Sequence, residues 1–162
     1  MELADGSHPV FWNTDGIVTV LDAASGLTVS DIRINGAGQV MWTARRIEDD
    51  YYVSPHQVFK WSETGGLSTL PFLVGTESAM AVALNDLGQI LGYSGNHAAV
   101  WNDDDSLINL GAATPEDFVY MYDINNKAQI ASSFTPSPEP SSLLELLAGL
   151  GGVSTGLRWR KR

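Results

Sequence analysis

The chain has 162 residues, room for one ordinary domain, and its nine Lys and Arg against nineteen Asp and Glu give a net charge of −10. So acidic a protein argues against nucleic-acid binding, because phosphate contact needs clustered Lys and Arg. The chain has no cysteine, which excludes disulfides, thiolate metal sites and thiol nucleophiles.

Two short motifs alternate along most of the chain. The first reads apolar-Asn-x-x-Gly-Gln-apolar, and its copies are 34–40, 84–90 and 124–130. The second begins with His and ends with Trp, and its copies are 8–12, 56–61 and 97–101. Successive asparagines lie 50 and then 40 residues apart, and successive tryptophans 49 and then 40, which indicates a repeat architecture. The residues that we assign to the structure of the repeat are Asn35, Gly38, Gln39, Asn85, Gly88, Gln89, Asn125, Gln129, Trp12, Trp61 and Trp101.

Each repeat predicts four short strands. Apolar and aromatic segments alternate with Gly, Asn and Asp clusters, the usual signals of strands and hairpin turns. In the clearest copy the segments are 81–84, 89–93, 97–101 and 106–110. The first copy opens at a third strand near His8 and the last one closes after a second strand near Phe134, which predicts twelve strands grouped as two, four, four and two.

A four-stranded repeat of about 40 to 50 residues is typical of a β-propeller blade. We therefore predict an all-β fold of repeated four-stranded antiparallel sheets over residues 1–134, an incomplete β-propeller-like array of about three blades, followed by a C-terminal apolar helix. Because closed propellers have about 4 to 8 blades, this chain alone is expected to form an open arc with exposed edges.

The turns of the first motif differ in one residue. Gly38 and Gly88 end the first two turns, where a left-handed backbone is often required. Ala128 takes this place in the third copy and would find that conformation costly, so we expect the third turn to differ. The longer first interval predicts a loop insertion at 45–55.

The two motifs resemble HAF repeats, β-repeat sequences of bacterial surface proteins that are named for a His-Ala-Phe-like segment. The copies here read His-Pro-Val-Phe, His-Gln-Val-Phe and His-Ala-Ala-Val. The resemblance covers about residues 8–134 and implies an extracellular β-repeat protein. It carries no agreed catalytic residues.

The C-terminal segment has three parts. A Pro/Ser linker at 135–142 contains Pro138, Glu139 and Pro140, and prolines favour an extended, accessible chain. A stretch at 143–157 predicts a helix that can enter a membrane, and a basic tail at 158–162 would stay on the cytoplasmic side. The apolar residues of the helix are Leu143, Leu144, Leu146, Leu147, Leu150, Val153 and Leu157, and the basic residues of the tail are Arg158, Arg160, Lys161 and Arg162.

This order of parts resembles the PEP-CTERM sorting signal of Gram-negative bacteria. The resemblance implies that a membrane peptidase, an exosortase, recognises Pro138, Glu139 and Pro140 after transient insertion in the inner membrane, and that the protein reaches the cell surface or the medium. Glu145 departs from the pattern, because it leaves an uncharged run of 12 residues at 146–157 where a full span needs roughly 20. The alternative is an amphipathic or buried helix with a basic end.

The first eight residues, Met-Glu-Leu-Ala-Asp-Gly-Ser-His, contain no basic segment followed by an apolar run, the pattern of a secretory signal. Sorting at the C-terminus requires such a signal. We therefore expect a chain that is a fragment or has a misassigned start, with a vestigial tail as the alternative.

Three sets of side chains are candidate sites. His8, His56 and His97 are either ligand-facing imidazoles or repeated structural hydrogen bonds at strand starts. The three repeated tryptophans either pack between sheets or form a platform on which sugars stack. The acidic runs 103–105 and 48–50 are either Ca²⁺ ligands or solvated turns.

The chain contains no motif of a nucleophile, a zinc protease or a phosphate-binding loop. We therefore expect a non-enzymatic exported protein with no catalytic residues, metal or cofactor, and with an exosortase and the inner membrane as partners. The first alternative is a carbohydrate-binding module with exopolysaccharide as its partner. The second is a degraded propeller hydrolase, which needs a pair of carboxylates about 5 to 10 Å apart.

Overall fold

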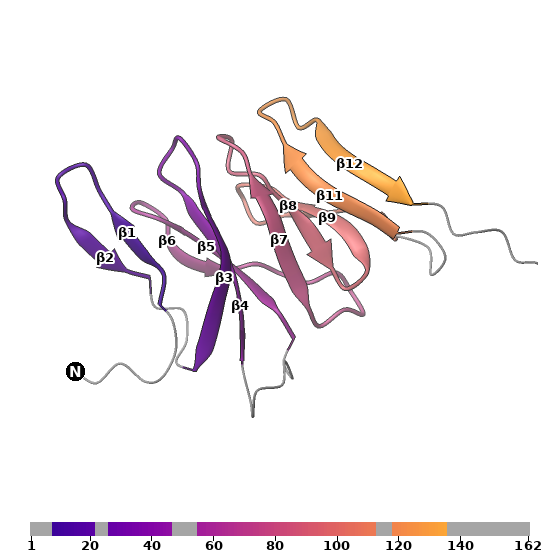
Figure 1. The fold of residues 1–162 in the computed structure, drawn as a ribbon, viewed down its shortest axis with the longest axis horizontal. Helices are drawn as coiled ribbons and strands as arrows, with labels where there is room; N and C mark the ends of the chain where they lie inside the picture. Colours follow the sequence, from indigo (N-terminus) through magenta and orange to yellow (C-terminus); the bar gives the residue numbers. More distant parts are fainter. Residues whose placement is uncertain (1–7, 22–25, 47–54, 113–117, 136–162) are drawn as a thin grey trace, which may run out of the picture.

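The computed structural model describes residues 8–21, 26–46, 55–112 and 118–135, and this part of the chain is all-β, with no helix (Figure 1). The strands are β1 (Val10–Trp12), β2 (Val18–Val20), β3 (Leu27–Ile34), β4 (Val40–Arg46), β5 (Gln57–Ser62), β6 (Gly66–Thr69), β7 (Ala79–Leu84), β8 (Ile90–Ser94), β9 (His97–Trp101), β10 (Leu107–Ala112), β11 (Phe118–Ile124) and β12 (Ile130–Thr135). The predicted C-terminal helix and most of the predicted loop insertion lie outside the described residues. Arg45 and Arg46, placed in that loop by the sequence, end strand β4 instead.

The strands form two complete sheets and two hairpins, all antiparallel. One complete sheet has the order β3-β4-β5-β6 and the other β7-β8-β9-β10, with neighbours in the sequence paired throughout. The hairpins are β1-β2 and β11-β12. Within the described residues, the predicted grouping of two, four, four and two strands is therefore confirmed. Figure 1 shows the four groups side by side in chain order, from the indigo hairpin β1-β2 to the orange hairpin β11-β12.

Three apolar layers fill the spaces between successive groups. Phe11 packs with Trp42 and Phe59 between hairpin β1-β2 and the first complete sheet. A second cluster joins the two complete sheets and includes Met41 and Trp101. The third lies between the second complete sheet and hairpin β11-β12. Truncating a buried aromatic to alanine typically costs about 3 to 5 kcal/mol, so the first two layers, which contain buried aromatics, bind their neighbours firmly.

The inner strands are buried on both faces, which explains why their sequences do not alternate cleanly. In β8, Ile90 belongs to the layer shared with the first complete sheet, whereas the adjacent Leu91 belongs to the layer shared with hairpin β11-β12. Gly92 follows, and a Cβ there would meet the backbone of Met80. A strand between two apolar layers reads as a continuous apolar run.

The third turn of the first motif does not differ from the other two, contrary to the sequence-based expectation. Ala128 has a φ of 56°, close to the 75° of Gly38 and Gly88. Its amide donates to the carbonyl of Asn125 at 3.0 Å, as that of Gly88 does to Asn85 at 3.1 Å. The hydrogen bonds of the turn therefore hold alanine in a conformation that costs an L-residue roughly 1 to 2 kcal/mol.

We predict that Ala128→Gly raises the free energy of unfolding by up to about 1 kcal/mol, because glycine adopts the left-handed backbone without a steric penalty. Urea denaturation measures the change. Gly38→Ala is the matched control, since a Cβ at Gly38 meets nothing within 4 Å; it should destabilise by a similar amount through backbone strain alone. Equal stability of all three proteins would contradict the turn geometry.

Candidate functional site

The asparagine of each repeated turn hydrogen-bonds its own turn in the same way. In the second copy, the Oδ1 atom of Asn85 accepts from the amides of Leu87 at 3.1 Å and Gln89 at 2.9 Å, and its Nδ2 atom donates to Oε1 of Gln89 at 2.9 Å. Asn35 and Asn125 repeat all three bonds in their own turns. The recurring Gln side chain is thus a partner of the recurring Asn, a pairing that the sequence spacing did not reveal.

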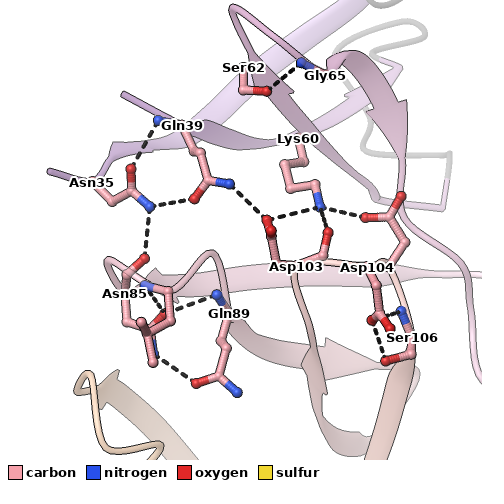
Figure 2. Close-up of polar contacts among 12 residues, drawn as sticks. Asn35, Gln39, Lys60, Ser62, Gly65, Asn85, Gln89, Asp103, Asp104 and Ser106 are labelled. Atoms are coloured by element: carbon pink, nitrogen blue, oxygen red, sulfur yellow. Dashed lines mark hydrogen bonds and ion pairs between the residues drawn. The ribbon is translucent and has the colours of Figure 1, made fainter. Parts of the chain in front are cut away.

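The same asparagines also connect one sheet to the next. Nδ2 of Asn35 donates to the backbone carbonyl of Asn85 at 2.8 Å, and Nδ2 of Asn85 donates to that of Asn125 at 2.9 Å. Figure 2 shows the first of these bonds together with Gln39 and Gln89. We call this series, formed by Asn35, Asn85 and Asn125, the asparagine ladder. It ties three successive units together at one end of the sheets.

A second series of contacts runs beside the ladder through Asp86. Its Oδ1 atom accepts from the amide of Gly36 at 2.8 Å, and its Oδ2 atom accepts from Nδ2 of Asn126 at 2.9 Å. The amide of Asp86 donates in turn to Oδ1 of Asn126 at 2.9 Å. These bonds favour the carboxylate, and the one from Asn126 contributes most to lowering the pKa of Asp86 below its ordinary value.

The acidic turn at 103–105 binds a side chain of the neighbouring sheet. Nζ of Lys60 lies 2.6 Å from Oδ1 of Asp105 and donates to the carbonyl of Asp103 at 2.6 Å. Nε2 of Gln39 donates to Oδ1 of Asp103 at 2.7 Å (Figure 2). The lysine ammonium therefore lies at the acidic turn that the sequence left open as either a set of Ca²⁺ ligands or a solvated turn. Two hydrogen bonds from Ser106 lower the pKa of Asp104, which is exposed.

The repeated tryptophans have three different environments. Trp101 is fully buried between the two complete sheets, and its Nε1 atom donates to the carbonyl of Pro71 at 2.8 Å. Trp61 is half-buried against Phe11, with ring centroids 4.9 Å apart. Trp12 is 61% exposed. The interpretation as sheet-packing residues thus holds for Trp101 and Trp61, and the three indoles do not form one sugar-stacking platform.

His56 and His97 have different partners. Nε2 of His56 is 3.4 Å from Nη1 of Arg45, and Nδ1 of His97 is 3.3 Å from Oδ1 of Asn109. Burial first, and then the charge of Arg45, lower the pKa of His56. Within the described residues no group of three or more His, Asp or Glu side chains is arranged to hold a metal ion.

Two residues that make polar contacts between sheets, Lys60 and Asp86, were not predicted from the sequence. Lys60 could have been found, because it is an extra residue in the second copy of the His-to-Trp motif, where a charge interrupts an apolar segment. Asp86 gave no such signal, since the corresponding residues of the other copies are Gly36 and Asn126. The predicted sorting residues Pro138, Glu139 and Pro140, the apolar stretch 143–157 and the basic tail lie outside the described residues.

No protein-family model, curated protein or solved structure matches the chain. Among the residues that the structure describes, no helix is long and apolar enough to cross a membrane.

We predict that Asn85→Ala lowers the free energy of unfolding by about 2 to 3 kcal/mol, because Asn85 is buried and its truncation leaves two turn amides without their acceptor and removes the bond to the carbonyl of Asn125. Asn125→Ala is the matched control. It removes the same bonds within its turn but none to a further sheet of the chain, and its exposed turn can be hydrated, so a loss of about 1 kcal/mol is expected. Equal losses in urea denaturation would show that the ladder adds nothing.

We predict that Asp86→Asn makes the free energy of unfolding depend less on pH in the acid range. The folded-state pKa of Asp86 lies below its unfolded value of 3.8, so its stabilising contribution is present above the unfolded pKa and is lost as the pH falls through the folded one. The variant should therefore be less stable than the parent at neutral pH and equal to it in strong acid. Urea denaturation across this range measures the difference. Glu63→Gln, at an exposed turn residue, is the control for the loss of one carboxylate.

Proposed function

We propose that this chain is a non-enzymatic repeat protein exported by a Gram-negative bacterium. Its stacked sheets serve as a rigid extracellular scaffold of the HAF-repeat kind, part of a β-propeller-like array. Its C-terminal segment is a PEP-CTERM-like signal that an exosortase recognises at Pro138, Glu139 and Pro140. The protein is held in the inner membrane through residues 143–157 before it reaches the cell surface or the medium.

The scaffold part of this proposal rests on the hydrogen bonds that the recurring polar side chains make. The asparagines and glutamines of the repeat bond one another or the next sheet. The acidic turn at 103–105 is engaged by Lys60 and Gln39. Polar side chains that bond a neighbouring sheet stabilise the array. A rigid array is suited to exposure outside the cell.

The sorting part is supported by the order of three unlike segments after the last described strand. A proline motif, an apolar stretch and a basic end succeed one another within residues 138–162. The basic end gives the orientation that the positive-inside rule expects. In this proposal the peptidase cleaves a peptide bond near the proline motif, and this chain is its substrate.

The test is to express the chain, preceded by a secretory signal peptide, in a host that has an exosortase, and to measure the mass of the exported protein. We expect a mass that has lost the apolar stretch and the basic tail. Replacing Pro138, Glu139 and Pro140 by alanine should leave the full-length form in the membrane, whereas Pro136→Ala, two residues before the motif, should be processed normally. A tail that stays uncut in the parent would contradict the sorting proposal.

A further inference from the structure

Equivalent positions of successive units differ in exposure according to whether a neighbouring sheet covers them. Trp101 is 0% exposed, Trp61 is half-buried and Trp12 is 61% exposed. A second series falls in exposure along the chain in the same way: Ile34 is 61% exposed, whereas Ile124 is 3% exposed. The two series identify one uncovered apolar surface, on hairpin β1-β2 with the adjacent strand β3. Tyr122 and Ile108, which are exposed, mark a second apolar surface at the end that carries hairpin β11-β12.

The two hairpins correspond to the two halves of a complete sheet. In each complete sheet, the strand after the Asn turn pairs with the strand that ends in the repeated Trp: β4 with β5, and β8 with β9. Among the described strands, β12 pairs only with β11 and β1 only with β2, so each hairpin leaves open the edge that the other would occupy. Neither β1 nor β12 contains a charged residue, although exposed edge strands are usually protected by charges.

We propose that β12 of one copy of this chain pairs with β1 of a second copy, so that the two hairpins together make a four-stranded sheet. The register follows from the complete sheets, where Val40 is opposite Trp61 and Ile90 is opposite Trp101. The equivalent pair is Ile130 opposite Trp12 of the second copy. Two residues further along, Trp42 is opposite Phe59 and Gly92 is opposite Ala99, which places Ser132 opposite Val10.

This pairing buries the apolar face of β1-β2. Val10 pairs with Val20 and Trp12 with Val18, so these four side chains share the face turned away from Phe11 and the first complete sheet. In the joined sheet they lie on the same side as Ile130, which packs against the second complete sheet of the other copy. Ile108 of the other copy faces these side chains. It is exposed, and it pairs with Val100, which is buried on that side of the sheet.

The opposite face of the joined sheet covers a second apolar surface. Tyr120 is opposite Ser133, and the hydroxyl of Tyr122 lies 3.0 Å from Oγ of Ser133, so both rings lie on the outer face of hairpin β11-β12. In the pair of copies this face meets strand β3, where Ile34 shares a side with Val40 and is exposed. The proposed contact therefore covers apolar residues on both of its sides.

The asparagine ladder continues across the same contact. The carbonyls of Asn85 and Asn125 each accept Nδ2 of the preceding asparagine in addition to a bond within their own turn. Among the described residues, the carbonyl of Asn35 has only the bond from Gly38, and Nδ2 of Asn125 donates only to Gln129. The joined sheet is followed by the first complete sheet of the second copy, which brings Asn125 to the carbonyl of that copy's Asn35.

A second copy is the occupant that the geometry favours. Figure 1 shows β1-β2 and β11-β12 at opposite ends of the array, so the hairpins of one chain do not meet each other. Each copy brings two complete sheets, and two copies joined at both ends add two shared ones. Counted over the described strands alone, the six sheets of such a pair fall within the number found in closed β-propellers, about 4 to 8. A head-to-tail contact that closes gives a ring of defined size.

The test is site-specific crosslinking of the full chain, which has no cysteine of its own. Val10→Cys and Ser132→Cys are prepared separately, mixed and oxidised. We expect a disulfide-linked heterodimer, because directly opposed residues of antiparallel strands are within the Cα range that a disulfide spans. Val10→Cys with Ser133→Cys is the matched control and should link poorly, since a shift of one residue turns the side chain to the other face.

Sedimentation of the unmodified chain provides the second measurement, with a concentration-dependent dimer expected. Trp12→Lys should weaken this association about tenfold or more, because it places an unpaired charge in the contact, and circular dichroism should show an unchanged β-fold. Val74→Lys, at a fully exposed turn residue outside both hairpins, should leave association unchanged. A chain that is monomeric at all concentrations, or equal linking of the matched and shifted cysteine pairs, would overturn the proposal.

Discussion

A β-sheet that is apolar on both faces is stable only between two neighbours. The second complete sheet meets this constraint, since Trp101 and Ile90 pack on one of its sides and Leu91 and Val100 on the other. Burial of this kind contributes roughly 25 cal/mol for each Å² of apolar surface removed from water. Because each unit depends on the next, stability in the array approximates a sum of repeat and neighbour terms. Within the described residues, the surfaces at its two ends are the places where this requirement is not met.

The asparagine ladder adds direction and register to this apolar packing. Hydrophobic contact alone would allow two sheets to slide or rotate, whereas the bond from Nδ2 of Asn35 to the carbonyl of Asn85 fixes one turn over the next. Asp86 and Lys60 strengthen the same end of the stack through contacts with adjacent sheets. The polar residues that recur in the sequence thus serve the spacing of the sheets, which is why they recur with the period of the fold.

Much of the fold could be predicted from the sequence, because strands, turns and repeat spacing leave local signals. The strand grouping and the left-handed turns at Gly38 and Gly88 followed from such signals. The conformation of Ala128 did not, since hydrogen bonds that span the turn override the local preference of alanine. Contacts between sheets could not be predicted from the sequence either. Lys60 binds Asp103 across 43 residues of sequence, and no local pattern indicates that contact. Whether the acidic turn binds a metal ion or a lysine is decided by this long-range geometry.

The central claim is that the recurring asparagines join successive sheets through side-chain to backbone hydrogen bonds. Nuclear magnetic resonance can detect this directly through the scalar coupling that a hydrogen bond transmits from the donor nitrogen to the acceptor carbonyl carbon. We expect a coupling between Nδ2 of Asn35 and the carbonyl carbon of Asn85, and another between Nδ2 of Asn85 and that of Asn125. Side-chain amides of Asn35 and Asn85 that show no such coupling and exchange freely with water would contradict the account.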